Sequence, residues 1–146
     1  MKILFKKCRD NAVMPLRATP ASAGYDIYSA NEAAVVIPAG EIRLIPTGLA
    51  VSAERTDIGL FIFPRSGFSA KYGVTLTNSV GVIDSDYRGE IMLSLINHGK
   101  EDFTVEPNMR LAQLIAFPVL SQEWIETDSL DDTDRGTGGF GSSGNN

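Results

Sequence analysis

Short apolar segments separated by turn residues are the feature that most constrains the fold of this chain. From residue 1 to about 127, β-branched residues and alternating apolar residues come in short runs, and Pro, Gly, Asn and Asp interrupt them. Such runs predict strands. The predicted strands are Ile3–Lys7, Tyr25–Ser29, Ala34–Ile37, Glu41–Ile45, Leu49–Ala53, Gly59–Phe63, Thr75–Thr77, Glu90–Ile96, Phe103–Val105, Arg110–Phe117 and Trp124–Glu126.

Helix-tolerant residues are concentrated in Ser66–Tyr72, which is long enough for a turn or two of helix. Many short strands with almost no helix predict an all-β fold, either an antiparallel sandwich, a jelly roll or a compact barrel. A chain of 146 residues is the size of one domain, and such a domain buries roughly 70% of its unfolded surface. We therefore expect one core, built from residues 1–127.

Net charge and cysteine content limit the function and the compartment. The formal charge of −5 disfavours binding to nucleic acid, although a few aimed Arg residues and a divalent cation can still bind a polyphosphate. Cys8 is the only cysteine, so an intrachain disulfide is impossible. The apolar runs are too short for a membrane span or a signal peptide, and we expect a cytoplasmic protein that binds no membrane.

The segment 128–146 differs in composition from the rest of the chain. It is acidic up to Asp134 and then rich in Gly and Ser, with Arg135 and Phe140 among them. Gly136, Gly138 and Gly141 match the dinucleotide-binding spacing, but no βαβ unit surrounds them, so that interpretation is rejected. The segment is either a disordered end or a flexible arm that closes over a ligand.

The segment Gly81–Glu90 predicts a hairpin with an acidic turn. Asp84 in this turn is either a solvated turn residue or a general base towards water, with Tyr87 forming a wall of a pocket. A serine protease triad is unsupported because His98 is the only histidine and lies in a Gly-flanked turn.

Three further segments contain candidates for an anion or metal site. Pro64-Arg65-Ser66-Gly67 precedes the predicted helix and predicts either an anion site or a helix with Ser66 as its N-cap. Asp26 is either a turn residue or an outer-sphere partner of Mg²⁺. Gln113 shares a largely apolar strand face with Leu111, so its amide needs a backbone or ligand partner.

Taken in order, several stretches resemble the sequence motifs of the trimeric dUTP pyrophosphatases (dUTPases). They are Ala23–Ala30, Pro64–Gly73, Asn78–Glu90, Arg110–Pro118 and Arg135–Gly144. The departures, such as Phe68-Ser69 where Leu-Ala is common, remove no group that the chemistry needs. The resemblance implies a jelly-roll-like β-barrel in a homotrimer, with active sites at subunit interfaces and the C-terminal arm exchanged between subunits.

The resemblance also implies Mg²⁺-dependent hydrolysis of dUTP to dUMP and pyrophosphate, which keeps uracil out of DNA and supplies dUMP for dTMP synthesis. Asp84 would activate the water, Tyr87 would pack beneath the deoxyribose, and Asp26 would reach Mg²⁺ through water. The residues implied to bind the substrate are Arg65, Ser66, Gly67, Asn78, Gly81, Val82, Ile83, Tyr87, Met92, Gln113, Arg135, Phe140, Gly141, Ser142 and Ser143.

Two alternatives remain open at this point. A dCTP deaminase shares the expected architecture but differs from this chain in the Gly81–Glu90 and Arg135–Gly144 stretches. A catalytically silent nucleotide-binding module that regulates a protein partner is the other alternative, and the full set of implied catalytic residues disfavours it.

Overall fold

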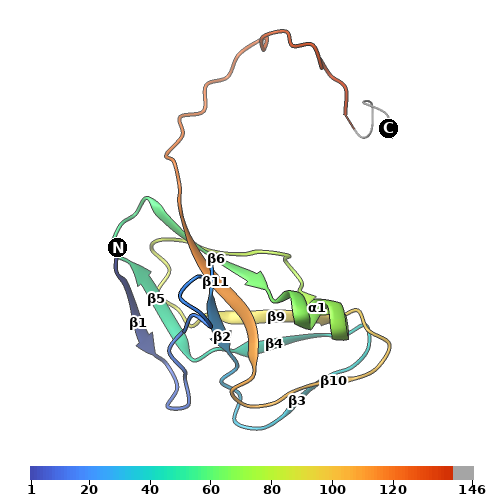
Figure 1. Cartoon of the computed structure of the whole chain (residues 1–146). Helices are drawn as coiled ribbons and strands as arrows, with labels where there is room; N and C mark the ends of the chain where they lie inside the picture. The colour runs from blue at the N-terminus through green and yellow to red at the C-terminus, as the bar shows by residue number, and fades with distance from the viewer. Residues whose placement is uncertain (140–146) are drawn as a thin grey trace.

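The computed structural model describes residues 1–139 (Figure 1). Eleven strands and one helix are described along the chain. Their order is β1 (Ile3–Lys7), β2 (Tyr25–Tyr28), β3 (Val35–Ile37), β4 (Ile42–Pro46), β5 (Leu49–Ala53), β6 (Ile58–Pro64), α1 (Ser66–Tyr72), β7 (Val74–Leu76), β8 (Gly81–Ile83), β9 (Met92–Asn97), β10 (Phe103–Val105) and β11 (Arg110–Pro118).

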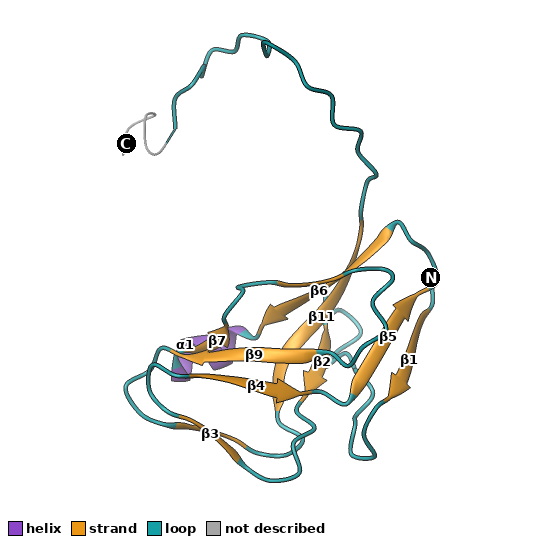
Figure 2. Ribbon diagram, turned by 180° about the vertical axis from the view of Figure 1, so that it is seen from behind, coloured by secondary structure: helices purple, strands orange, loops and turns teal. Residues whose placement is uncertain are grey.

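The strands form antiparallel sheets in which sequence neighbours are often not spatial neighbours. The largest sheet has the order β2-β11-β6-β8, and a second has the order β4-β9-β7. The pairs β1-β5 and β10-β3 complete the described sheets. Figure 2 shows the long antiparallel contact of β4 with β9, and the β1-β5 pair at one end of the molecule. The predicted all-β class is confirmed.

A single hydrophobic core lies between these sheets. Its fully buried side chains come from most of the strands, because residues at alternate positions of each strand face inward. Those with the largest volumes are Ile27, Ile37, Ile45, Leu49, Leu93, Leu95, Val74 and Val105. The core holds β6, β8 and β11 in place, and the candidate site lies at the ends of these strands.

The helix α1 has the predicted bounds. It ends at Gly73, which has φ 71° and so adopts the left-handed conformation that glycine tolerates best. It begins after Arg65, whose backbone is extended and whose side chain makes no capping hydrogen bond. Ser66 is the first helical residue, so the alternative in which Ser66 is the N-cap is wrong. No helix in residues 1–139 is long and apolar enough to cross a membrane.

Two predicted elements are absent. Trp124–Glu126 forms no strand, and the Trp124 side chain is 91% exposed. In Figure 1 the chain leaves the body of the molecule after β11, and among residues 1–139 no strand pairs with this segment. The predicted hairpin is also wrong, because β8 pairs with β6 whereas β9 pairs with β4 and β7. The segment between them is a loop that joins two sheets.

Candidate functional site

A cavity of about 280 Å³, here called the loop cavity, lies beside this loop. One wall is β8, which pairs with β6 only and therefore has a free edge among the described strands. The opposite wall comes from the start of β9. The sequence-predicted residues that line it are Asn78, Gly81, Val82, Ile83, Asp84, Tyr87 and Met92. The structure places these residues around one cavity.

Hydrogen bonds to backbone carbonyls give the loop its shape. The Tyr87 N–H donates to the Asp84 carbonyl at 3.1 Å, which closes a turn. The Arg88 guanidinium donates to the carbonyls of Ser85 and Tyr87 at 2.8 and 2.9 Å. The turn leaves Asp84 exposed on the cavity wall, with its carboxylate available to water.

Glu90 ends the loop and also lines the cavity. Its Oε1 accepts hydrogen bonds from Arg9 Nε and from the Gly48 N–H, both at 2.8 Å. Burial alone would raise the pKa of the Glu90 carboxyl, but these two hydrogen bonds and the Arg9 charge together lower the pKa below its ordinary value. Glu90 is therefore a charged anchor for the loop.

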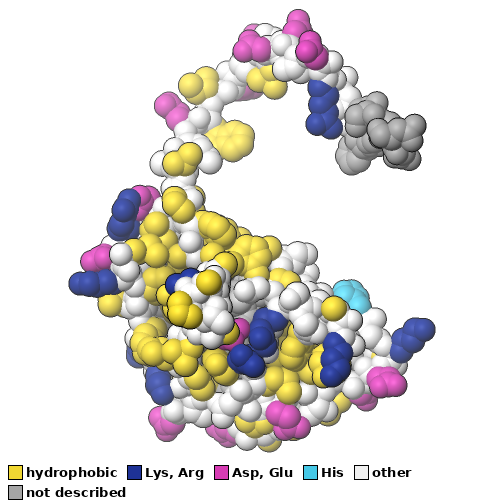
Figure 3. All heavy atoms as spheres, in the orientation of Figure 1, with side chains coloured by type: hydrophobic (Ala, Val, Ile, Leu, Met, Phe, Trp, Pro, Cys, Tyr) yellow, Lys and Arg dark blue, Asp and Glu magenta, His cyan; other side chains and the backbone are white. Residues whose placement is uncertain are grey.

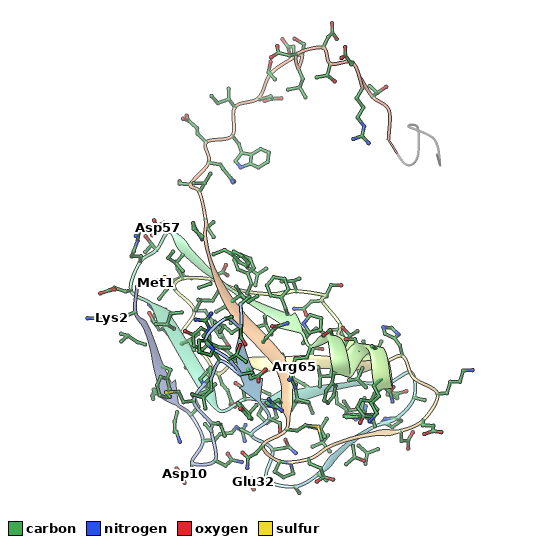
Figure 4. All side chains as sticks on the ribbon, viewed as in Figure 1. Met1, Lys2, Asp10, Glu32, Asp57 and Arg65 are labelled. Atoms are coloured by element: carbon green, nitrogen blue, oxygen red, sulfur yellow. The ribbon has the colours of Figure 1, made fainter. Side chains whose placement is uncertain are left out.

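A second cavity, of about 340 Å³, lies at the end of β6 and the beginning of α1 and is here called the arginine cavity. Figure 4 shows Arg65 at this junction. Arg65 Nε lies 3.1 Å from Asp26 Oδ1, and Arg110 Nη1 lies 3.2 Å from Asp26 Oδ2. One largely buried carboxylate thus orients two guanidinium groups, and the cluster keeps a net positive charge.

Gln113 lies in the arginine cavity because of close backbone packing. Its Nε2 donates to the Pro64 carbonyl at 3.1 Å, so the partner that this amide needs is a backbone group. A Cβ on Gly24 would lie 2.8 Å from Gln113 Oε1, so only glycine fits there without a shift. The register of β11 against β2 shifts between Arg110 and Ala112, and this irregularity brings both Arg110 and Gln113 to the Asp26 side.

Ser66 and Gly67 complete the arginine cavity. They are the first two residues of α1, where backbone N–H groups have no acceptor within the helix. A Cβ on Gly67 would meet no atom within 4 Å, so the surface beside it is open. Arg65, exposed N–H groups and the Ser66 hydroxyl can together bind an anion.

No group of three or more His, Cys, Asp or Glu side chains that could hold a metal ion occurs in residues 1–139. The arginine cavity contains the single carboxylate of Asp26. Mg²⁺ keeps several waters and binds through one or two carboxylates together with substrate phosphates. The residues present therefore fit a Mg²⁺ ion that arrives with a phosphorylated ligand.

The two cavities share no lining residue among those described. Arg135 lines neither cavity, and its Nε donates to the Gly138 carbonyl at 3.0 Å. The predicted residues Phe140, Gly141, Ser142 and Ser143 lie outside the described part of the chain. The structure thus brings the predicted residues together in two groups rather than one.

Sequence reasoning missed Arg110 and Glu90. Arg110 contacts Asp26 across the β2-β11 pair, and Glu90 contacts Gly48 and Arg9 across long stretches of sequence. Neither residue follows a local spacing rule. The only signal for Glu90 was an acidic residue at the end of the predicted hairpin Gly81–Glu90.

Similarity to known proteins identifies the family of this chain. A family model described as dUTPase matches residues 10–144. The deoxyuridine 5'-triphosphate nucleotidohydrolase of Desulfitobacterium hafniense is 45% identical over 144 residues, which cover 99% of this chain and 95% of the relative. The enzyme of the same name from Rickettsia felis is 51% identical over 131 residues, 90% of this chain and 88% of the relative.

Solved structures give the same result. The Staphylococcus bacteriophage 80alpha dUTPase with dUpNHpp has a TM-score of 0.88 and 27% identity, covering 98% of both chains. The dUTPase of phage phi11 of S. aureus, at 24% identity, has a TM-score of 0.82 and covers 91% of this chain and 100% of the phage chain, which shows similarity of fold. Because the family model spans nearly the whole chain and the relatives cover it almost completely, the chain belongs to the dUTPase family of deoxyuridine 5'-triphosphate nucleotidohydrolases.

Proposed function

We propose that the chain hydrolyses dUTP to dUMP and pyrophosphate through in-line attack of water on the α-phosphorus, assisted by Mg²⁺. The observation that carries this proposal is the loop cavity, in which Asp84, Tyr87 and a free strand edge surround one space. The reaction would remove dUTP, which keeps uracil out of DNA, and would supply dUMP for dTMP synthesis in the cytoplasm.

The free edge of β8 and the amide of Asn78 would recognise uracil. Alternating backbone N–H and C=O groups along Gly81–Ile83 suit the alternating carbonyls and N3–H of the uracil edge. Cytosine presents an amino group and an unprotonated N3 at the same positions, so its donors and acceptors are mismatched. Met92 and the cavity walls would limit the space at C5 and exclude the thymine methyl group.

Asp84 would orient the attacking water and accept its proton. Exposure on the cavity wall supports this role, because the base must reach a water molecule in line with the leaving group. The Tyr87 ring would lie beneath the deoxyribose and leave no room for a 2′-hydroxyl. Pyrophosphate would then leave without a covalent intermediate.

The arginine cavity would bind the phosphates. Arg65, Ser66, Gly67 and Gln113 would hold phosphate oxygens, and Asp26 would hold Mg²⁺ through water together with those phosphates. When bound, Mg²⁺ neutralises charge on the phosphates and favours pyrophosphate as a leaving group. The Arg65 guanidinium is already oriented for phosphate binding by its ion pair with Asp26.

A homotrimer with an exchanged C-terminal arm would join the two cavities. Within one subunit the two cavities share no lining residue among those described. In the trimer, a nucleotide would occupy the loop cavity of one subunit and the arginine cavity of another. The outer face of the β4-β9-β7 sheet exposes Ile42, Leu44 and Met92. A neighbouring subunit would cover this apolar face.

The C-terminal segment supports the same assembly. Figure 3 shows hydrophobic side chains along the segment as it leaves the body, followed by acidic ones. Leu120, Trp124, Ile125 and Leu130 are 78%, 91%, 79% and 87% exposed. These side chains would pack on a neighbouring subunit. Residues 128–146 would form the arm, in which Phe140 stacks on uracil, Gly141 allows close approach, and Arg135, Ser142 and Ser143 hold the γ-phosphate.

Pyrophosphate release from each of the common ribo- and deoxyribonucleoside triphosphates, with Mg²⁺ present, tests the proposal. We expect rapid release from dUTP alone. Comparable rates with dTTP, dCTP or UTP would contradict the assigned recognition. Ammonia release from dCTP would favour the deaminase alternative, and dUTP binding without hydrolysis would favour the regulatory module.

A further inference from the structure

Glu90 contacts three separate parts of the molecule. Its carboxylate accepts hydrogen bonds from Arg9, in the segment that follows β1, and from the N–H of Gly48, in the turn before β5. Its backbone carbonyl accepts a hydrogen bond from the Tyr87 hydroxyl at 3.0 Å. One residue therefore links the N-terminal segment and the Gly48 turn to the aromatic wall of the loop cavity.

The Gly48 side of this link is rigid. Gly48 has φ 69°, and a Cβ at this position would lie 2.6 Å from the Ala12 Cβ. The Cys8 N–H donates to the Gly48 carbonyl at 2.7 Å, which ties the segment after β1 to the same turn. The Gly48 N–H group that Glu90 binds is therefore held in place by the packing of Gly48 against Ala12 and by the backbone hydrogen bond from Cys8.

Residue 91 is also fixed. The Ile91 N–H donates to the Leu49 carbonyl at 2.7 Å, and the buried Thr47 hydroxyl donates to the Ile91 carbonyl at 2.7 Å. The backbone at Ile91, where the loop ends, is therefore held in place. The hydrogen bonds of the Glu90 side chain hold the last residue of the loop in the same way. Gly89 lets the Tyr87 ring lie directly against the loop backbone, since a Cβ there would overlap the Tyr87 hydroxyl.

We propose that Glu90 is a positioning residue. By binding Arg9 and Gly48, it holds the Tyr87 ring in the position that admits deoxyribose and excludes ribose. This inference rests on the proposed function. If the carboxylate loses its partners, residue 90 can shift and the hydrogen-bonded Tyr87 ring shifts with it. A displacement of about 1 Å is enough to make room for a hydroxyl group or to misplace the reacting groups.

Arg9 has a second effect in the same arrangement. Glu90 lines the loop cavity together with Asp84, so two carboxylates lie where a polyphosphate nucleotide would approach. The Arg9 guanidinium, 2.8 Å from the Glu90 oxygen, neutralises one of them. Loss of Arg9 leaves an unpaired negative charge at the cavity, which weakens nucleotide binding.

The test is the ratio of kcat/KM for dUTP to kcat/KM for UTP, measured for the wild type, Glu90→Gln, Arg9→Met and the double variant. We expect Glu90→Gln and Arg9→Met each to lower this ratio by about tenfold, because the Tyr87 wall moves. The dUTP to UTP ratio of the double variant should be no lower than that of the more strongly affected single variant, since both substitutions break the same Arg9–Glu90 contact. Arg55→Met is the matched control: Arg55 pairs with Asp57, neither residue lines the loop cavity, and the ratio should not change.

A lower stability with an unchanged dUTP to UTP ratio in both single variants would mean that the link is merely structural, and would overturn the inference while leaving the proposed function intact. A wild type that leaves dUTP unhydrolysed would overturn the proposed function and the inference together. If Glu90→Gln fails to fold, Arg9→Met decides, because the Arg9 side chain is 39% exposed and its replacement disturbs no core packing.

Discussion

Arg65 Nε lies 3.1 Å from Asp26 Oδ1, and this ion pair, together with a hydrogen bond from Arg65 Nη1 to the Arg110 carbonyl at 3.3 Å, orients the guanidinium at the beginning of α1. The second oxygen of Asp26 binds Arg110, so the carboxylate is shared between two cations. The pair couples the proposed metal residue to the proposed phosphate residue. A change at Asp26 should therefore affect both metal and phosphate binding.

Asp26→Asn should lower the free energy of unfolding by about 2 kcal/mol, because a largely buried group loses its ion pair with Arg65 and the charge assistance of its hydrogen bond from Arg110. The KM for dUTP should rise by about tenfold as Arg65 loses its orientation. Urea unfolding and steady-state kinetics measure the two effects. Asp57→Asn, in an exposed pair with Arg55, is the control and should leave the free energy of unfolding and the KM for dUTP almost unchanged, because solvent screens an exposed pair. Equal effects of the two substitutions would contradict this role for Asp26.

Asp84→Asn should preserve dUTP binding and reduce kcat by about 10²-fold to 10⁴-fold, since an amide cannot accept the proton of the attacking water. Isothermal titration with a non-hydrolysable dUTP analogue and pyrophosphate release measure binding and turnover. Asp86→Asn, in the same turn but outside the described lining of the loop cavity, is the matched control. Near-normal turnover in Asp84→Asn would exclude Asp84 as the base.

Trp124→Ser should weaken the trimer. The Trp124 side chain is 91% exposed in one subunit, and burial of its apolar surface against a neighbour would contribute about 2 kcal/mol. The trimer loses three such contacts, and its midpoint concentration varies as the square root of the dissociation constant, so sedimentation at decreasing protein concentration should show dissociation at about 150-fold higher concentration than for the wild type. The neighbouring substitution Glu123→Gln should leave the oligomer unchanged. A trimer of wild-type stability in Trp124→Ser would mean that the segment does not pack between subunits.

Deletion of all residues after Asp134 should leave a folded trimer with severely reduced turnover. The deletion removes Arg135 and the Gly-rich stretch but none of the described strands. Circular dichroism, sedimentation and pyrophosphate release measure the three properties. An unchanged kcat/KM for dUTP would show that the arm is a passive linker.

The stability contributed by Glu90 should depend on pH. Its folded pKa lies below the ordinary value of 4.5, so the contribution is complete above that value and is lost as the pH falls through the folded pKa. The unfolding free energy of the wild type should exceed that of Glu90→Gln at neutral pH, and the difference should shrink below about pH 4.5. Urea unfolding at a series of pH values measures this, and a difference that grows towards acid pH would contradict the assigned ionisation.

The strand pattern, the bounds of α1 and the grouping of Asn78 with Asp84 and Tyr87 were predictable from the sequence, because they depend on alternation and on local spacing. The predicted hairpin failed for a physical reason. Turn residues indicate that the chain changes direction, but they do not determine which strands pair. Pairing depends on which strand edges are free in the folded core, and β8 pairs with the edge of β6.

The sequence by itself determined that the chain is an all-β domain, because period-two alternation is a local property. Its resemblance to the dUTPase motifs predicted which residues carry the proposed chemistry. Only the tertiary structure decided that Asp26 joins Arg65 to Arg110 and that Glu90 joins Arg9 to Gly48. These contacts depend on strand register, on an irregularity in β11 and on glycines that permit close approach. Each contact joins residues that are far apart in the sequence, and a local sequence pattern cannot predict such a contact.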